Sequence, residues 1–149
     1  MVDDAVAVLL ALLERFEGLY LRPYLCPAGV WTIGLGTTRY PNGRPVRPTD
    51  PPITRARAYE IAEHQVRAQY LPDALRACRG KLNTAGRMAA IGSFGYNLGN
   101  GALLASTMLK RILADRWSDV PKELSKWVRG GGRVLPGLVK RRAAEAALI

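Results

Sequence analysis

The stretch from residue 16 to residue 38 constrains the fold of this chain more than any other. The segment before it carries apolar residues at helical spacing on one face: Val6, Leu9, Leu10, Leu13 and Phe16. Asp3 and Asp4 are candidate N-caps for this helix, and Gly18 stands where glycine commonly follows a helix end. The pattern predicts a first helix that ends at Glu17.

Two short segments with strand-like composition follow that helix. Residues 19–25 and 30–38 are rich in aromatic and β-branched side chains, and the turn sequence Pro27-Ala28-Gly29 separates them. They predict a small antiparallel hairpin. Residues 40–52 are rich in Pro and Gly and are expected to form a loop, with a turn or a third short strand within it.

The rest of the chain is predicted to be helical. Thr54 is the expected cap of a helix to Tyr70 that ends or kinks at Leu71-Pro72, and Asn83 is the expected cap of a helix that closes at residues 97–101. Further helices are expected over residues 102–104, 107–114, 118–128 and 136–148, with a flexible break at 130–132. A helix, a small sheet and then more helices predict an α+β fold. The 149 residues suit a single domain.

The positive charge of the chain is concentrated in its second half. Residues 1–75 carry eight basic and eight acidic side chains, whereas residues 76–149 carry fourteen basic and four acidic ones. Such an excess suits an anionic polymer or surface, namely nucleic acid, lipid headgroups or peptidoglycan; a solvated helical surface is an equal alternative. No zinc-finger, RNA-binding or basic-zipper pattern is present, so nucleic acid is not expected as a partner.

The N-terminus and the two cysteines indicate the compartment in which the chain is made. Asp3 and Asp4 stand where a secretory signal has basic residues, and the apolar run over residues 5–13 is too short to span a bilayer. Synthesis in the cytoplasm is therefore expected. Cys26 and Cys78 are too few for a disulfide framework or a zinc site, although one long-range bridge stays open.

Three residues in the opening stretch have a characteristic spacing. Glu17, Cys26 and Thr32 follow the order Glu–x8–Cys–x5–Thr. This order resembles the Glu–x8–Asp/Cys–x5–Thr signature of the phage-type lysozymes (endolysins) of glycoside hydrolase family 24, and the residues from Tyr24 to Gly34 are typical of its Cys-bearing branch. Similar family segments are residues 93–101, 106–110, 127–132 and 135–142, so the resemblance covers residues 16–145. One departure is Thr37, where family members often have His.

The resemblance implies a fold and an activity. It implies a lysozyme-like α+β domain over residues 1–149, with a small antiparallel β lobe over residues 15–55 and a larger helical lobe formed by residues 56–149 and the N-terminal helix. The active-site cleft is expected between these lobes. The implied reaction is hydrolysis of the β-1,4 bond between N-acetylmuramic acid and N-acetylglucosamine in peptidoglycan. No metal or organic cofactor is implied, a monomer is expected, and export through holin pores is implied for a chain without a signal peptide.

The catalytic roles are carried by Glu17, Cys26 and Thr32. At the C-terminal end of a helix the dipole disfavours a negative charge, which suits a carboxyl group that must donate a proton. Glu17 is thus the candidate general acid; the alternative is a helix-end carboxylate paired with an arginine. Cys26 is the candidate general base. Alternatively, its thiol could act as a nucleophile or orient the water, or it could be inert and buried with a purely structural role. By resemblance, Thr32 holds the attacking water; its alternative is a threonine chosen for the strand.

Substrate binding is assigned by resemblance to Asn97, Tyr24 and Arg141. Asn97 would hydrogen-bond the saccharide, and the same residue could end a helix. For Arg141 and Arg142 the favoured interpretation is solvated charges near the end of the last helix, with contact to substrate or to cleft carboxylates as the alternative. His64, the only histidine, is expected at the surface.

Two other functions stay open from sequence. A lytic transglycosylase would use the same Glu17 without water, and 1,6-anhydromuramic products would identify it. A cationic protein that binds walls or anionic membranes would lyse cells without catalysis through the basic segment 127–149. In that case Glu17→Gln would still clear purified peptidoglycan.

Overall fold

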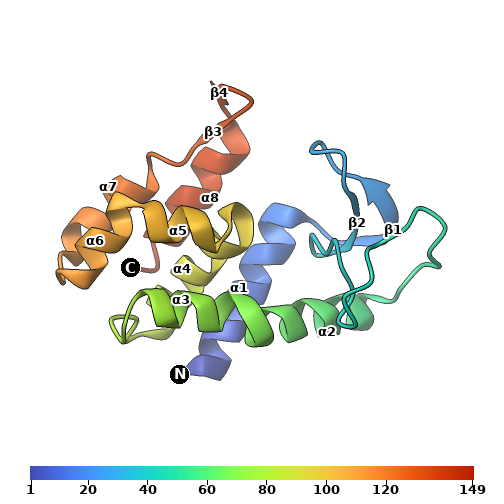
Figure 1. Cartoon of the computed structure of the whole chain (residues 1–149), viewed down its shortest axis with the longest axis horizontal. Coiled ribbons are helices and arrows are strands. Elements are labelled where there is room, and N and C mark those ends of the chain that lie inside the picture. Colours follow the sequence, from blue (N-terminus) through green and yellow to red (C-terminus); the bar gives the residue numbers. More distant parts are fainter. The chain divides into compact units, whose positions relative to one another are not determined.

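The computed structural model describes all of residues 1–149 (Figure 1). The residues form two compact units, Leu10–Ala68 and Met1–Leu9 together with Gln69–Ile149. The chain passes between them within the first helix, α1 (Val2–Glu17), and within a π-helix, η1 (Val66–Tyr70). The unit that carries the sheet is larger than the lobe expected over residues 15–55, because it also holds the end of α1 and all of α2 (Arg55–Gln65).

The unit Leu10–Ala68 is built around an antiparallel hairpin. Strand β1 (Tyr20–Leu25) pairs with β2 (Trp31–Gly34) so that Tyr24 faces Thr32, and α2 packs against β2. The hairpin is the one predicted, but its second strand ends at Gly34 rather than at residue 38. Gly34 and Gly36 adopt φ of +66° and +79°, which turns the chain so that Ile33 and Thr37 bond back to each other.

The last turn of α1 is fixed in the same unit. The helix ends at Glu17 as predicted, where Gly18 has φ of +82° and its N–H donates to Glu14 O at 3.1 Å. The Glu14 carboxylate accepts two bonds from Arg55 of α2, at 2.6 and 2.9 Å, and one from the Tyr59 hydroxyl. The orientation of the helix end is thus tied to α2.

The Pro- and Gly-rich loop is ordered by one carboxylate. Asp50 accepts from the Tyr40 hydroxyl at 2.8 Å, from Arg44 Nη1 at 3.1 Å and from the Arg47 N–H at 2.8 Å. The backbone hydrogen bond from Arg47 is the main cause that lowers the pKa of Asp50. The loop holds turns and an isolated bridge but no third strand.

Helix α2 begins as predicted, and the helical segment continues through η1 to Tyr70, the predicted end. Thr54 caps it by accepting from the Arg57 N–H at 3.1 Å. The predicted end or kink at Leu71-Pro72 is confirmed, because η1 ends at Tyr70 and a new helix, α3 (Leu71–Ala77), begins there. Pro72 lies in the first turn of α3, where the missing N–H costs no helical hydrogen bond.

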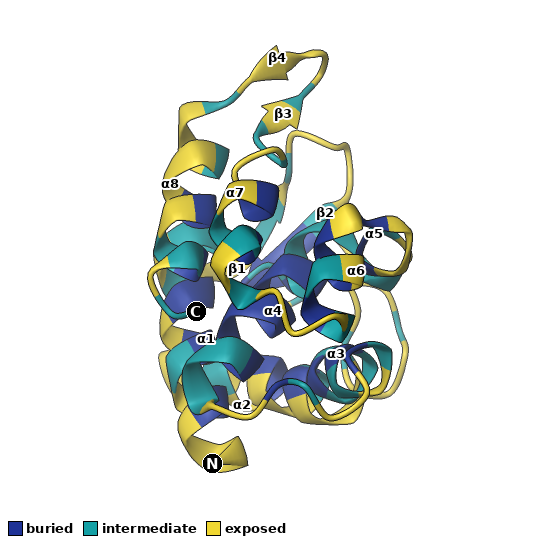
Figure 2. Ribbon diagram, turned by 90° about the vertical axis from the view of Figure 1, so that its left-hand side faces the viewer, coloured by how far each residue is buried: buried dark blue, intermediate teal, exposed yellow.

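The other unit surrounds the buried helix α4 (Ala85–Leu98), which contacts α3, α5 (Asn100–Ala105) and α8 (Pro136–Ala146). Residues 88–95 of α4 are all buried (Figure 2). A methyl group at Gly92 would lie 2.9 Å from Leu9 Cδ2, so the start of α1 packs closely on α4 there. The cap of α4 is Thr84 and not Asn83, since Thr84 Oγ1 accepts from the Arg87 N–H.

The C-terminal segments differ from expectation at two places. Helix α6 (Thr107–Leu113) follows prediction, but the helix expected over residues 118–128 is a 3-10 turn, η2 (Trp117–Asp119), and a short α7 (Val120–Leu124). The glycines expected to form a flexible break turn a small hairpin of β3 (Arg129–Gly130) and β4 (Arg133–Val134), largely exposed in Figure 2. Gly131 and Gly132 supply its positive φ values.

Taken unit by unit, the structure confirms the α+β class, with a helical majority and a small antiparallel sheet. None of the helices is long and apolar enough to cross a membrane. Both cysteines are free thiols.

Candidate active site

Glu17 lies at the junction between α1 and the hairpin. Its side chain is half-buried and rests on the backbone of Gly36, where an added methyl group would come within 3.0 Å of Glu17 Oε2 and 3.1 Å of Cδ. The turn after β2 therefore provides the surface against which the carboxyl group packs. Only a residue without a side chain leaves room for it.

Cys26 and Thr32 lie at the far end of the same hairpin. The Cys26 N–H donates to Val30 O at 3.0 Å and closes the turn, and the Gly29 N–H donates to Cys26 O. Thr32 is 3% exposed, and its hydroxyl donates to Val30 O at 2.9 Å. The thiol and the hydroxyl therefore meet on one side of a short β-turn.

The turn also adjusts the acidity of the thiol. A hydrogen bond from the backbone of Val30 is the largest effect and lowers the pKa of Cys26 from its ordinary value of 9.0, while partial burial opposes it. Smaller hydrogen bonds from the Ala28 and Gly29 backbone act in the same direction. These donors stabilise the thiolate, which is the form that can accept a proton.

Tyr24 connects the two ends of this arrangement. Burial raises the pKa of its hydroxyl most, followed by the charge of the Tyr20 phenolate. The ionised forms of Glu17 and Cys26 raise the pKa of Tyr24 further, so both groups act on it electrostatically. Tyr20 and Tyr24 also stack, with ring centroids 4.0 Å apart. Within the unit Leu10–Ala68, Tyr24 therefore faces Thr32 across the hairpin and interacts electrostatically with both Glu17 and Cys26.

Thr37 occupies the position where a histidine was anticipated by resemblance. It is 1% exposed, and its hydroxyl lies 3.5 Å from Gln65 Oε1 of α2. The Gln65 side chain in turn donates to Arg39 O. Thr37 and Gln65 therefore connect the turn after β2 to α2.

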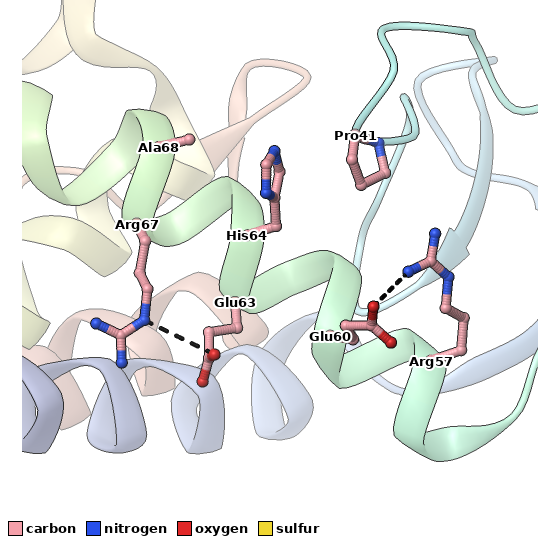
Figure 3. Close-up of a pocket in the computed structure, with 7 residues that line it drawn as sticks. All are labelled: Pro41, Arg57, Glu60, Glu63, His64, Arg67 and Ala68. Atoms are coloured by element: carbon pink, nitrogen blue, oxygen red, sulfur yellow. Dashed lines mark hydrogen bonds and ion pairs between the residues drawn. The ribbon is translucent and has the colours of Figure 1, made fainter.

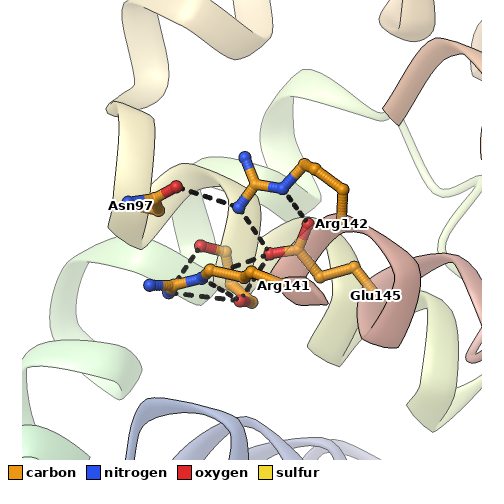
Figure 4. Close-up of polar contacts among 5 residues, drawn as sticks. Asn97, Arg141, Arg142 and Glu145 are labelled. Atoms are coloured by element: carbon orange, nitrogen blue, oxygen red, sulfur yellow. Dashed lines mark hydrogen bonds and ion pairs between the residues drawn. The ribbon is translucent and has the colours of Figure 1, made fainter. Parts of the chain in front are cut away.

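Asn97 and Arg141 belong to the other unit and to a buried ionic cluster (Figure 4). Arg141, Arg142 and Glu145 are 3%, 1% and 0% exposed, so the favoured interpretation of the two arginines as solvated charges is wrong. Arg142 Nε lies 2.8 Å from Glu145 Oε2, and Arg141 Nε lies 3.5 Å from Glu145 Oε1 and 3.3 Å from Ser93 Oγ. Direct contact of Arg141 with substrate stays untested, and this burial argues against it.

Glu145 and Ser93 are buried members of this cluster that the sequence pattern did not single out. Glu145 lies three and four positions after its two partners, the spacing that brings side chains together on a helix. That pattern could have signalled the cluster. The same spacing also occurs in exposed ion pairs, and the burial that distinguishes the two cases comes from packing on α4.

His64 lies at the surface, as expected, in an open hollow of about 500 Å³ beside Pro41 (Figure 3). The charged residues around it pair locally, Arg57 with Glu60 and Arg67 with Glu63. The hollow contains none of the candidate catalytic residues. No group of three or more His, Cys, Asp or Glu side chains is placed to hold a metal ion.

Comparison with known proteins identifies the family of the chain. Residues 14–145 match the Phage lysozyme family. The endolysin of Acyrthosiphon pisum secondary endosymbiont phage 1 is 35% identical, over 93% of this chain and 92% of that protein. The SAR-endolysin of Haemophilus phage HP1 is 28% identical, over 93% and 76%. The solved structure of an endolysin from Escherichia coli O157:H7 phage FAHEc1 superposes with a TM-score of 0.80 at 29% identity, over 95% of this chain and 89% of that one.

Proposed function

Because this chain belongs to the phage lysozyme family and is an endolysin that hydrolyses peptidoglycan, we propose that Glu17, Cys26 and Thr32 perform the cleavage. The bond cleaved is the β-1,4 linkage between N-acetylmuramic acid and N-acetylglucosamine. The observation that carries this assignment is the pairing, within one unit, of a half-buried carboxyl group at a helix end with a thiol whose pKa is lowered.

In the proposed reaction Glu17 is the proton donor and Cys26 is the proton acceptor. Glu17 donates its proton to the glycosidic oxygen as the bond from that oxygen to the anomeric carbon breaks. A water molecule held by the Thr32 hydroxyl attacks the anomeric carbon from the opposite face and gives up a proton to the Cys26 sulfur. One carbon–oxygen bond breaks and one forms, and the configuration at that carbon inverts.

Substrate contacts are proposed for Tyr24 and Asn97. The charges of Glu17 and Cys26 both raise the pKa of Tyr24. Its phenol can donate a hydrogen bond to the substrate. Asn97 lies in the last turn of α4 and is half-buried. Neither residue changes protonation in the reaction, so their replacement should act on binding more than on turnover.

The decisive experiment compares wild type with Glu17→Gln on purified cell walls. Glutamine keeps the size and polarity of the side chain but cannot donate the proton, so turbidity should stop falling. Mass spectrometry of wild-type products should show reducing ends that carry oxygen from water. Clearing by Glu17→Gln at the wild-type rate would refute the catalytic assignment. Products with 1,6-anhydromuramic ends would show that the reaction is transglycosylation and not hydrolysis.

A second role is favoured by the surface around β3, β4 and α8. Val134 and Val139 are 48% and 44% exposed, and the exposed cations Arg129, Arg133 and Lys140 lie near them in sequence. Exposed apolar residues among cations suit an anionic surface, so we infer contact of a monomeric enzyme with anionic lipid or envelope polymer. Access to the wall through holin pores belongs to the same proposal. Sedimentation of Glu17→Gln with anionic and with neutral vesicles tests it, and equal binding to both would refute it.

A further inference from the structure

The buried ionic cluster of Ser93, Arg141, Arg142 and Glu145 has an outer end at Asn97 (Figure 4). Glu145 is fully buried and Arg142 nearly so, whereas Asn97 is half-buried. Arg142 Nη2 donates to Glu145 Oε1 and also to Asn97 Oδ1, each at 2.9 Å. One guanidinium nitrogen therefore joins the buried carboxylate of Glu145 to the Asn97 amide in the last turn of α4.

The chemistry of this contact decides which way the amide faces. A guanidinium has only donors, so the atom of Asn97 that meets it must be the carbonyl oxygen. A flipped amide would set two donors against each other inside a buried site, which is costly. The Nδ2 group of Asn97 is consequently turned away from Arg142.

The cluster also holds the guanidinium in place. Glu145 accepts from Arg142 and from the Ser93 hydroxyl, the latter at 2.7 Å, and Arg141 donates to Ser93 O at 3.3 Å. Two arginines against one glutamate leave a net positive charge behind the Asn97 oxygen. That charge polarises the amide and makes its N–H groups stronger donors.

We propose that Arg142 is a positioning residue for substrate binding, which fixes the Asn97 amide so that it presents N–H donors rather than a carbonyl acceptor to peptidoglycan. The substrate group at this position is then an oxygen acceptor. This inference rests on the proposed function, in which Asn97 contacts the saccharide. Arg142 itself, almost fully buried, acts only through Asn97.

The first test replaces the amide. Asn97→Asp keeps an oxygen for Arg142 but has no donor, and Asn97→Ala has neither. On solubilised, uncross-linked glycan strands both variants should raise KM roughly threefold to tenfold, the value of one hydrogen bond, with kcat unchanged. The Asp variant should keep the wild-type Tm. A wild-type KM for Asn97→Asp would overturn the proposal, since an outward acceptor would then serve equally well.

The second test replaces the guanidinium. Arg142→Lys keeps the charge but not the fork that reaches both Glu145 and Asn97. It should raise KM as much as Asn97→Ala does, and the double variant should show no further rise. Arg87→Lys is the matched control, because Arg87 Nη1 donates to Asn83 Oδ1 at 2.8 Å next to the start of α4. Its KM should stay at the wild-type value.

Two results would reduce Arg142 to a structural role. One is a lower Tm for Arg142→Lys with a wild-type KM, and the other is an additive rise in the double variant. Asn97→Asp leaves the buried cluster intact, so it decides the proposal even where Arg142→Lys fails to fold. Wild-type KM for both Asn97 variants would overturn this inference alone, because Glu17→Gln tests the reaction independently.

Discussion

Gly36 determines how closely the backbone approaches the carboxyl group of Glu17. Its φ of +79° is strained for other residues, and a methyl group there would lie 3.0 Å from Glu17 Oε2. Gly36→Ala should destabilise the protein by about 1–2 kcal/mol and lower kcat by roughly tenfold or more, because it displaces the acid. Chemical denaturation and wall turbidity measure the two effects.

Gly43→Ala provides the control for this prediction. Gly43 has φ of +86°, but no atom lies within 4 Å of an added methyl group. It should lose similar stability and keep wild-type turnover. Equal turnover in both alanine variants would show that the contact between Gly36 and Glu17 has no catalytic effect.

Cys26 should set the acid side of the pH–rate profile. A base must be deprotonated, so kcat/KM should rise with pH through the pKa of Cys26, which its hydrogen bonds place below 9.0. In Cys26→Asp this limb should move down to about pH 4, with activity retained. Cys26→Ala should lose most turnover at every pH. An acid limb that is identical in wild type and Cys26→Asp would remove Cys26 from the role of base.

At the scale of the elements, helix caps are independent sources of stability. The Ser106 hydroxyl accepts from the Leu109 N–H at 3.1 Å at the start of α6 and is itself buried. Ser106→Ala should cost about 1 kcal/mol of unfolding free energy. The rate on soluble glycan strands should not change below the transition temperature. A change in kcat without a change in stability would contradict a purely capping role.

The elements also show what local sequence could predict. Gly18 and Thr54 marked helix ends correctly, because a positive φ and a capping oxygen are local requirements. The ends of β2 and of α7 were predicted too late. The end of β2 is set by pairing across the turn at Gly34–Gly36, and the end of α7 is set by the β3–β4 hairpin that follows it. Both pairings depend on residues that meet only after folding. Pro72 marked the change of helix correctly, since η1 ends at Tyr70 and Pro72 lies in the first turn of α3.

At the scale of the whole molecule, each unit has its own charge. The unit Leu10–Ala68, which holds Glu17, has eight basic and five acidic residues, or +3. The other unit has fourteen basic and seven acidic residues, or +7. Attraction to an anionic wall is therefore expected to come mainly from the second unit, where it is screened by salt over about 10 Å at 0.1 M.

This charge predicts a salt effect that depends on the size of the substrate. KM on intact walls should rise with NaCl concentration, whereas KM on short soluble strands should change little. Arg129→Gln together with Arg133→Gln should weaken the effect. An equal salt effect on both substrates would assign it to the catalytic site instead. The sequence predicted the surplus of charge in the second half correctly, but not the burial of Arg141 and Arg142 around Glu145.

The two thiols of the molecule differ in a way that can be used. Cys26 lies partly exposed on the hairpin with a lowered pKa, whereas burial raises the pKa of Cys78 to about 12. An alkylating reagent at neutral pH should therefore consume one equivalent per folded molecule. Iodoacetamide would then count competent enzyme in a preparation, and the extent of labelling should match the loss of lytic activity one for one.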